Sequence, residues 1–222
     1  MDIFFRMCLR LMTNQRQPGY KLVLLGDASV GKTSLVGRFV TNQFNEAVET
    51  TVGAAFSTQS VTTDSGRSIK FEIWDTAGQE RFKSLAPMYY RNASCAVVVF
   101  DLTSETSFSR AKEWVKQLSL SNNPNIVIGL AGNKSDIPSS QRQVKPEEIK
   151  QFVLDEGLIY FETSAKTGNN VQKIFEAIAN KLPDSPFTPA ALGGAARTTA
   201  ITIAPGETTQ TGGLASKCCG GS

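Results

Sequence analysis

The sequence predicts an α/β fold, with one six-stranded, mostly parallel sheet, one antiparallel hairpin strand, and helices on both faces. Short apolar runs alternate with helical patterns from Tyr20 to Leu182, which is typical of a parallel sheet covered on both sides. The turn-forming residues Asp64-Ser65-Gly66 separate the second and third runs, so this pair is predicted to form a hairpin. The longest apolar runs have the length of buried strands and are too short to span a membrane.

The predicted strands are 20–25, 54–63, 67–74, 95–100, 126–131 and 159–162. The predicted helices are 31–41, 83–92, 106–120, 146–156 and 169–181, and Asn169-Asn170 is a candidate cap for the last of them. Ligands of such sheets bind at the carboxyl ends of the strands. We therefore expect functional residues directly after strands.

The segments outside 20–182 have a different composition from this domain. Residues 1–19 are mildly apolar but are interrupted by Arg6 and Arg10, so we expect a flexible leader rather than a signal peptide, with a short amphipathic segment that contacts lipid as the alternative. Residue 2 is Asp, which does not fit myristoylation, and whether the cellular protein starts at Met1 or Met12 stays open. Residues 183–222 are rich in Pro, Ala, Gly and Thr, which predicts a disordered tail.

Charge and composition exclude several functional classes. The 222 residues carry a net charge of only +3, and without a run of Lys or Arg we expect no nucleic-acid partner. The chain has no histidine, which excludes mechanisms that need a histidine base or ligand. Its four cysteines do not resemble a disulfide framework, and Cys95 is predicted to be inert core in a protein of a reducing compartment.

Residues Gly26 to Thr33 have the phosphate-loop form G-x-x-x-x-G-K-[ST], between a predicted strand and a predicted helix. The glycines let backbone N–H groups surround phosphate oxygens, and the helix start adds its positive dipole end. Lys32 is predicted to reach the β- and γ-phosphates as a catalytic group, and Thr33 to bind Mg²⁺ through its hydroxyl. The predicted nucleotide-binding residues here are Ala28, Ser29, Val30, Gly31, Lys32, Thr33 and Ser34.

The sequence Asn133-Lys134-Ser135-Asp136 follows the fifth predicted strand and favours guanine as the base. The carboxylate of Asp136 can accept hydrogen bonds from the ring N–H and the exocyclic amine of guanine. Adenine has an acceptor at the ring position and would be disfavoured. Lys134 is predicted to lay its alkyl stem over the base, and Asn133 to tie this loop to the phosphate loop.

A second base-binding segment, Ser164-Ala165-Lys166, follows the last predicted strand. We expect the backbone N–H of Ala165 to donate to the guanine oxygen. This segment follows the sixth strand and the Asn133-to-Asp136 segment follows the fifth, and this joint placement argues against a chance match of both motifs.

The metal and the attacking water are predicted to lie near the end of the third strand, in the segment Trp74 to Glu80. Asp75 is a candidate Mg²⁺ ligand, the N–H of Gly78 can approach the γ-phosphate, and Gln79 would orient the attacking water as a catalytic residue. Thr51 is the candidate second hydroxyl ligand of Mg²⁺, and Phe44 is a candidate contact to the base.

Residues 20–182 resemble the Rab branch of the small GTPases, whose Ras-like G domain is a P-loop NTPase fold. The residues that carry the resemblance are Val52-Gly53-Ala54-Ala55-Phe56, Phe71-Glu72-Ile73-Trp74-Asp75, Glu80-Arg81-Phe82, Met88-Tyr89-Tyr90-Arg91 and Val99-Phe100-Asp101-Leu102-Thr103. The combination of Gly53-Ala54-Ala55-Phe56 with Ser84 to Tyr90 is most similar to the early-endosomal subfamily.

The resemblance implies a monomeric GTP-hydrolysing switch that regulates early-endosomal vesicle traffic and fusion. GTP would order residues 42–56 and 76–92, and hydrolysis would release them. The resemblance also implies an exposed aromatic triad that effectors read, formed by Phe56, Trp74 and Tyr89. The implied partners are effectors, a guanine-nucleotide exchange factor, a GTPase-activating protein, a GDP-dissociation inhibitor and a prenylation escort protein.

The paired cysteines Cys218 and Cys219 resemble the doubly geranylgeranylated Rab tail. Gly220 and Gly221 are not aliphatic, so farnesylation at a C-a-a-X box is not supported. Two lipid chains anchor where one binds reversibly, which implies the cytoplasmic face of early endosomes with a soluble cytosolic pool. Ala28 is a departure from the Gly or Ser of many small GTPases, and its methyl group is expected to slow hydrolysis.

Two other functions stay open at this point. One is an ATP-dependent phosphate-loop enzyme, and the other is a nucleotide-locked interaction protein that does not turn over. Lys32, Thr51, Asp75 and Gln79 favour a hydrolytic switch over the second alternative.

Overall fold

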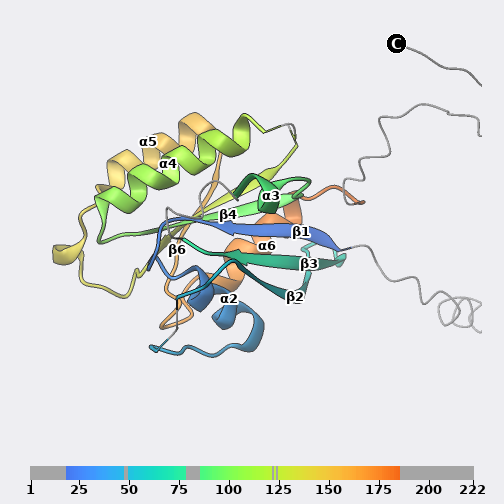
Figure 1. The fold of residues 1–222 in the computed structure, drawn as a ribbon, viewed down its shortest axis with the longest axis horizontal. Helices are drawn as coiled ribbons and strands as arrows, with labels where there is room; N and C mark the ends of the chain where they lie inside the picture. The colour runs from blue at the N-terminus through green and yellow to red at the C-terminus, as the bar shows by residue number, and fades with distance from the viewer. Residues whose placement is uncertain (1–18, 48–49, 79–85, 122, 124, 186–222) are drawn as a thin grey trace, which may run out of the picture. The chain divides into compact units, whose positions relative to one another are not determined.

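The computed structural model describes residues 19–47, 50–78, 86–121, 123 and 125–185 (Figure 1). The chain forms two compact units, Met1–Thr188 and Pro189–Ser222. The second unit lies wholly outside the described residues, so the structure below is that of the first.

A single sheet of six strands forms the centre of the domain, in the order β2-β3-β1-β4-β5-β6. The pair β2 and β3 is antiparallel, and every other neighbouring pair is parallel. The predicted sheet and its one hairpin are therefore confirmed. The strands are β1 (Tyr20–Leu25), β2 (Ala54–Thr62), β3 (Ser68–Thr76), β4 (Cys95–Asp101), β5 (Val127–Asn133) and β6 (Ile159–Glu162).

Three strands extend further than the apolar pattern predicts. β3 continues through Asp75 to Thr76, β4 continues to Asp101, and β5 continues to Asn133. Backbone pairing explains these extensions, because Thr76 lies opposite Ala54 and Asn133 lies opposite Asp101. Candidate site residues that the sequence places in loops are thus held at strand ends.

Helices connect the strands and begin near the predicted positions. They are α2 (Lys32–Thr41), α3 (Ala86–Tyr90), α4 (Glu105–Ser119), the short 3-10 helix η2 (Ser139–Gln141), α5 (Pro146–Glu156) and α6 (Val171–Lys181). Of the predicted helix 83–92, residues 83–85 lie outside the described residues, and the helix ends at Tyr90.

The prediction that Asn169-Asn170 caps the last helix is wrong, because no side-chain capping hydrogen bond forms there. Asn170 occupies the position before α6, but its side chain makes no capping hydrogen bond. Its Nδ2 instead donates to the carbonyl of Glu162 at 2.9 Å. Asn170 has a φ of 53°, and this left-handed backbone places α6 two residues later than predicted.

The sheet carries a hydrophobic core on each face. On one face, α2 and α6 meet through Phe39 and Phe175, whose rings stack with centroids 3.8 Å apart. On the other face, Phe108 of α4 packs against Phe100 of β4 and Phe152 of α5. Figure 1 shows α4 and α5 on the opposite side of the sheet from α2. Because both faces are covered, every residue of β4 is buried, including Cys95, which is a free thiol as predicted.

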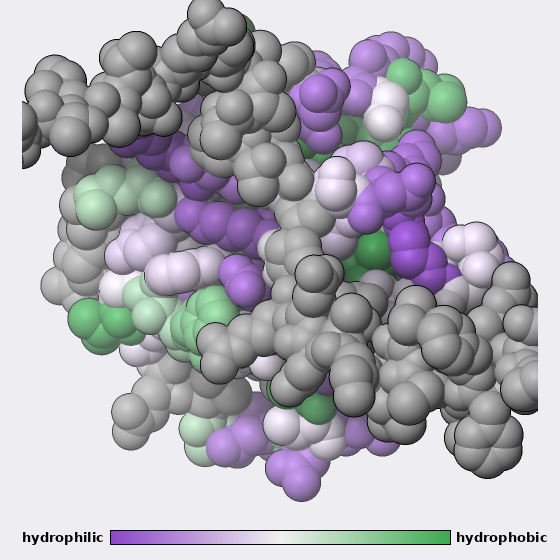
Figure 2. All heavy atoms as spheres, turned by 90° about the vertical axis from the view of Figure 1, so that its right-hand side faces the viewer, coloured by the Kyte–Doolittle hydropathy of each residue, from purple (hydrophilic) through white to green (hydrophobic). Residues whose placement is uncertain are grey.

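The edge of the sheet at the amino end of β1 is closed by polar contacts. Arg67 donates from Nη2 to the carbonyl of Leu182 at 2.6 Å and pairs through Nη1 with Asp184 at 2.6 Å. Asn180 donates to Asp64 at 3.0 Å. Hydrophilic and hydrophobic residues are interspersed over the described surface seen from this side (Figure 2). Within the described residues, no helix combines the length and apolar character needed to cross a bilayer.

Candidate nucleotide and magnesium site

The phosphate loop leaves the carboxyl end of β1 and turns into α2. Gly26 and Gly31 have φ values of 147° and 95°, a region that favours glycine. A Cβ atom on Gly26 would collide with the carbonyl of Val99, and one on Gly31 with the side-chain amide of Asn133. Both glycines are therefore required by the close approach of neighbouring strands.

Lys32 lies inside the curve of this loop with only 6% of its surface exposed. Its Nζ donates to the carbonyl of Gly26 at 3.0 Å and to that of Asp27 at 2.8 Å. Burial lowers the pKa of Lys32 to about 8, against the opposing effect of Asp75 and Asp27. A Cβ atom on Gly78 would collide with this ammonium group, so the absence of a side chain at Gly78 keeps the space beside Lys32 open.

A pocket of about 250 Å³ lies beside the ammonium group of Lys32. Its walls come from the phosphate loop, from the start of α2 and from the segment before β2. The lining residues include the predicted nucleotide contacts Ala28, Ser29, Gly31, Lys32, Thr33, Ser34, Thr51 and Gly78. Val30 is buried beneath the loop.

Thr33 contacts both of the other predicted magnesium ligands. Thr33 Oγ1 donates to Asp75 Oδ2 at 2.6 Å and shares a hydrogen bond with Thr51 Oγ1 at 2.7 Å. Asp75 is buried, and its Oδ1 has no hydrogen-bond partner among the described residues. Burial raises the pKa of Asp75, although the hydrogen bond from Thr33 and the charge of Lys32 oppose this shift.

These residues fit Mg²⁺. An unpaired carboxylate oxygen is costly to bury, and a cation beside Asp75 Oδ1 would remove that cost. Hydroxyl and carboxylate oxygens are the donors that Mg²⁺ prefers. Among the described residues, no cluster of three or more His, Cys, Asp or Glu could form a different kind of metal centre.

Asn133 joins the phosphate loop to the two predicted base-binding segments. From the end of β5 its Nδ2 donates to the carbonyl of Val30 at 2.8 Å, which is the tie that the sequence predicts. Its Oδ1 accepts from the backbone N–H of Ala165 at 3.2 Å. The predicted contact between the Ala165 N–H and a guanine oxygen thus stays a prediction.

Asp136, the predicted guanine acceptor, is oriented by the segment after β6. Its Oδ1 accepts from Ser164 Oγ at 2.6 Å. The backbone N–H of Ser135 donates to the carbonyl of Thr163 at 3.0 Å. The two base-binding segments are therefore hydrogen-bonded to each other as well as to Asn133.

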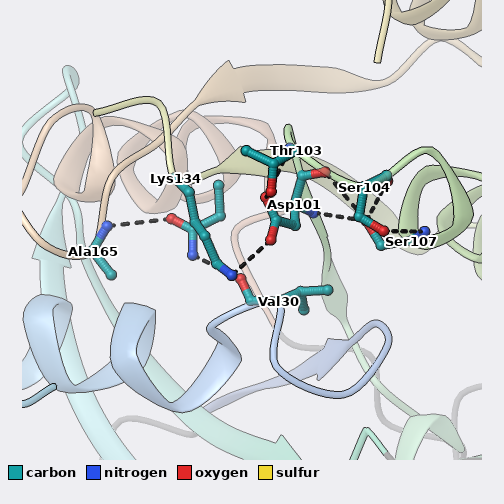
Figure 3. A network of polar contacts seen from close by, with 8 residues as sticks. Val30, Asp101, Thr103, Ser104, Ser107, Lys134 and Ala165 are labelled. Atoms are coloured by element: carbon teal, nitrogen blue, oxygen red, sulfur yellow. Dashed lines mark hydrogen bonds and ion pairs between the residues drawn. The ribbon is translucent and has the colours of Figure 1, made fainter. Parts of the chain in front are cut away.

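Lys134 is held by a residue for which the sequence suggested no role. Its Nζ lies 2.6 Å from Asp101 Oδ2, at the carboxyl end of the adjacent strand β4 (Figure 3). Asp101 Oδ1 accepts from the backbone N–H of Thr103 at 2.8 Å and from its hydroxyl at 2.7 Å. Burial alone would raise the pKa of Asp101, but the hydrogen bonds from Lys134 and Thr103 hold it below its usual value.

The signal for Asp101 was positional. It is the only charged residue of β4 and stands at the carboxyl end of that strand, where ligands of such sheets bind. Arg38 on α2 is a second missed residue. Its side chain contacts the carbonyls of Ala165 and Lys166, and a helix-surface arginine gives no sequence signal for such contacts.

The predicted aromatic triad is exposed only in part. Phe56 is 56% exposed, and its ring centroid lies 5.5 Å from that of Trp74. Trp74 and Tyr89 are half-buried and pack against the core on the α4 side of the sheet, so the expectation of three exposed rings is wrong for these two. Phe44 is also half-buried and packs against the core under α2. Its contact to a base stays a prediction.

Three predicted functional residues, Gln79, Cys218 and Cys219, lie outside the described residues. Their roles in hydrolysis and lipidation stay predictions.

The fold and this site define a P-loop GTPase domain. Residues 21–184 match the sequence pattern of the Ras family, to which the chain belongs. Over 163 residues the chain is 55% identical to the GTP-binding protein ypt5 of Schizosaccharomyces pombe, and the match covers 73% of this chain and 77% of that protein. The chain is accordingly a GTPase, and its resemblance to the Rab branch and the early-endosomal subfamily is confirmed.

Proposed function

We propose that this chain is a GDP/GTP switch that regulates early-endosomal vesicle traffic and fusion through GTP-dependent effector binding. The observation that carries the proposal is the position of Asn133, which bonds to both the phosphate loop and the loop after β6. This arrangement suits a ligand with a polyphosphate at one end and a base at the other. The name of the yeast relative, a GTP-binding protein, supports the same ligand.

The phosphates of the nucleotide would bind to the backbone N–H groups of residues 27–32 and to the ammonium group of Lys32. Lys32 Nζ already bonds to two carbonyls within the loop, which fixes where its charge lies. A phosphate beside it would favour the charged form and raise its pKa from about 8.

Guanine would bind to Asp136, with the stem of Lys134 across its face. The hydrogen bond from Ser164 orients the carboxylate of Asp136, and the pair with Asp101 fixes the direction of Lys134. Both base contacts therefore depend on residues of a neighbouring strand or loop.

Mg²⁺ would be held by Thr33, Thr51 and Asp75, and when bound it neutralises charge on the transferred phosphate. Gln79 would orient the attacking water. Intrinsic turnover should be slow, on the order of 10⁻⁴ s⁻¹, with an activating protein supplying an arginine that adds roughly 10³–10⁵-fold.

The segments 42–56 and 76–92 would change order with the nucleotide, and Phe56 would then contact effectors with Trp74 and Tyr89. Exchange factor, activating protein, GDP-dissociation inhibitor and prenylation escort protein are proposed from the family. Geranylgeranyl groups on Cys218 and Cys219 would hold the protein on the cytoplasmic face of early endosomes, with a cytosolic pool.

Nucleotide competition tests the base assignment. Bound fluorescent GDP should be displaced by GTP at equimolar amounts and not by a hundredfold excess of ATP. Displacement by ATP would instead support an ATP-dependent enzyme. Phosphate release, measured with and without an activating protein, then separates a hydrolytic switch from a protein that binds GTP without turnover.

A further inference from the structure

Arg38, near the end of α2, uses all three guanidinium nitrogens on backbone carbonyls. Nε donates to the carbonyl of Ala165 at 2.9 Å and Nη2 to that of Lys166 at 2.6 Å. Nη1 donates to the carbonyl of Asn42 at 2.8 Å. A planar guanidinium holds its donors in a fixed fork, so these three carbonyls are fixed relative to one another.

Two of the three carbonyls belong to the predicted guanine-binding segment Ser164-Ala165-Lys166. The N–H of Ala165 bonds to Asn133, and the hydroxyl of Ser164 bonds to Asp136. Arg38 therefore holds the outer side of a segment whose inner side bonds to two other base-site residues. Loss of the fork would remove a charge-assisted hydrogen bond from the carbonyl of Ala165 and another from the carbonyl of Lys166.

The third carbonyl belongs to the residue where α2 ends. Asn42 has a φ of 55°, and its N–H donates to the carbonyl of Arg38 at 3.0 Å. From Asn42 the chain enters the segment that leads to Thr51, the candidate magnesium ligand. Arg38 thus joins the start of that segment to the base-binding segment 164–166.

A second link between the same two segments is weaker. Lys166 Nζ lies 3.2 Å from Glu46 Oε1, but the two side chains are 58% and 76% exposed. Exposed pairs of this kind contribute little. The fork of Arg38 is accordingly the main connection that the described residues make between the two segments.

We propose that Arg38 is a positioning residue that couples the segment after α2 to the guanine-binding segment and so slows nucleotide release. This inference rests on the proposed guanine site. When the segment after α2 moves, the carbonyl of Asn42 moves with it, and the fork can no longer hold all three carbonyls. Opening of one segment would then loosen the hold of the other on the base.

The test uses the full chain loaded with fluorescent GDP, whose release is followed by dilution into excess GDP. Arg38→Lys keeps the charge, but its single ammonium nitrogen cannot reproduce the planar fork of three nitrogens, and we expect release about tenfold faster than in the wild type, as for the loss of one charge-assisted hydrogen bond. Arg38→Gln, which keeps one amide donor, should speed release as well. The acceleration should be smaller with a chelator than with Mg²⁺, because removal of the ion from Thr51 would already free the segment after α2 in the wild type and so disturb the fork there.

Arg67→Lys is the matched control, since Arg67 makes a similar fork to the carbonyl of Leu182 and the carboxylate of Asp184 at the opposite edge of the sheet. It should lower the melting temperature about as much as Arg38→Lys and leave GDP release unchanged. Wild-type release rates in both Arg38 variants, or equal acceleration in Arg67→Lys, would overturn the proposal. A wild-type chain that binds no GDP would overturn the proposed function instead, so the two failures are distinguishable.

Discussion

Lys134 Nζ and Asp101 Oδ2 lie 2.6 Å apart and join the ends of adjacent strands β5 and β4. Lys134 adopts a φ of 67°, a left-handed conformation that strains a residue with a long side chain. The ion pair favours this conformation, because it is from there that Lys134 reaches Asp101. Asp101 therefore fixes the lysine whose stem is predicted to cover the base.

Removal of the Asp101 charge should lower stability in a pH-dependent way. The folded pKa of Asp101 lies below its usual value, so the ionised carboxylate stabilises the fold above pH ~4, and this contribution is lost as the pH falls through the folded pKa. Because Lys134 is 36% exposed, we expect Asp101→Asn to reduce the free energy of unfolding by about 0.5–1 kcal/mol at pH 7.

Urea unfolding of both proteins with excess GDP and Mg²⁺ at pH 7, 5 and 4 measures this difference. The difference should be constant between the two higher values and smaller at the lowest. A difference that grows on acidification would contradict the assigned direction of the pKa. Asp64→Asn serves as the control, because Asp64 is exposed and its carboxylate bonds to Asn180, far from Lys134.

Exchange of the guanine acceptor should change base preference. Asp136→Asn replaces one of two acceptors by an N–H donor, which opposes the paired donors of guanine. We expect GDP affinity to fall on the order of 10³-fold or more, while xanthosine diphosphate, which has a carbonyl in place of the amine, binds better than to the wild type. Competition against fluorescent GDP measures both. Ser164→Ala should weaken GDP only about fivefold and gain nothing for xanthine.

Loss of the buried carboxylate should remove the effect of magnesium on nucleotide release. In the wild type, a chelator should speed GDP release, because Thr33, Thr51 and Asp75 would lose the ion. In Asp75→Asn the ratio of release rates with and without chelator should approach one. Asp155→Asn, on the surface of α5, should retain the wild-type ratio, and a wild-type ratio in Asp75→Asn itself would exclude Asp75 as a metal-site residue.

Gln79→Leu should abolish stimulated hydrolysis while nucleotide binding persists. A leucine cannot orient the attacking water, so the roughly 10³–10⁵-fold stimulation by an activating protein should be lost. Single-turnover phosphate release from GTP measures this directly. The same substitution on α5, Gln151→Leu, should leave stimulation intact. Normal stimulated turnover in Gln79→Leu would rule out the proposed role.

The stability of the fold should depend on Phe175, which packs α6 against α2. Phe175 is fully buried and stacks on Phe39, so Phe175→Ala should lower the free energy of unfolding by about 3–5 kcal/mol. Leu154→Ala removes an apolar side chain that is 67% exposed, and it should cost less than about 0.5 kcal/mol. Chemical denaturation at fixed GDP and Mg²⁺ compares the two variants.

The sequence predicted the sheet well because a strand such as β4, buried on both faces, leaves a continuous apolar run. It failed at strand ends, where backbone pairing keeps Asp75, Thr76, Asp101 and Asn133 in the ladder. Backbone hydrogen bonds are indifferent to side-chain polarity, so hydropathy cannot show where such strands end. The partial burial of Trp74 was not predicted either, because its ring packs against core residues from distant parts of the chain.

Some residues of the candidate site could be predicted from the sequence and others could not. Motifs with fixed local spacing, such as the phosphate loop and Asn133 to Asp136, were recognisable because neighbouring residues carry the chemistry. Asp101 and Arg38 were not recognised, because each acts on a segment that is distant in the chain.

By itself the sequence determined which segments become strands. It also determined that the site binds phosphate and guanine groups, and that no histidine takes part. The tertiary structure alone decided that Asp101 holds Lys134 and that Arg38 bonds to the carbonyl of Ala165, 127 positions further along the chain, as well as to that of Asn42. Local preferences and short motifs depend on adjacent residues, whereas these contacts exist only once parallel strands bring their carboxyl ends to one edge.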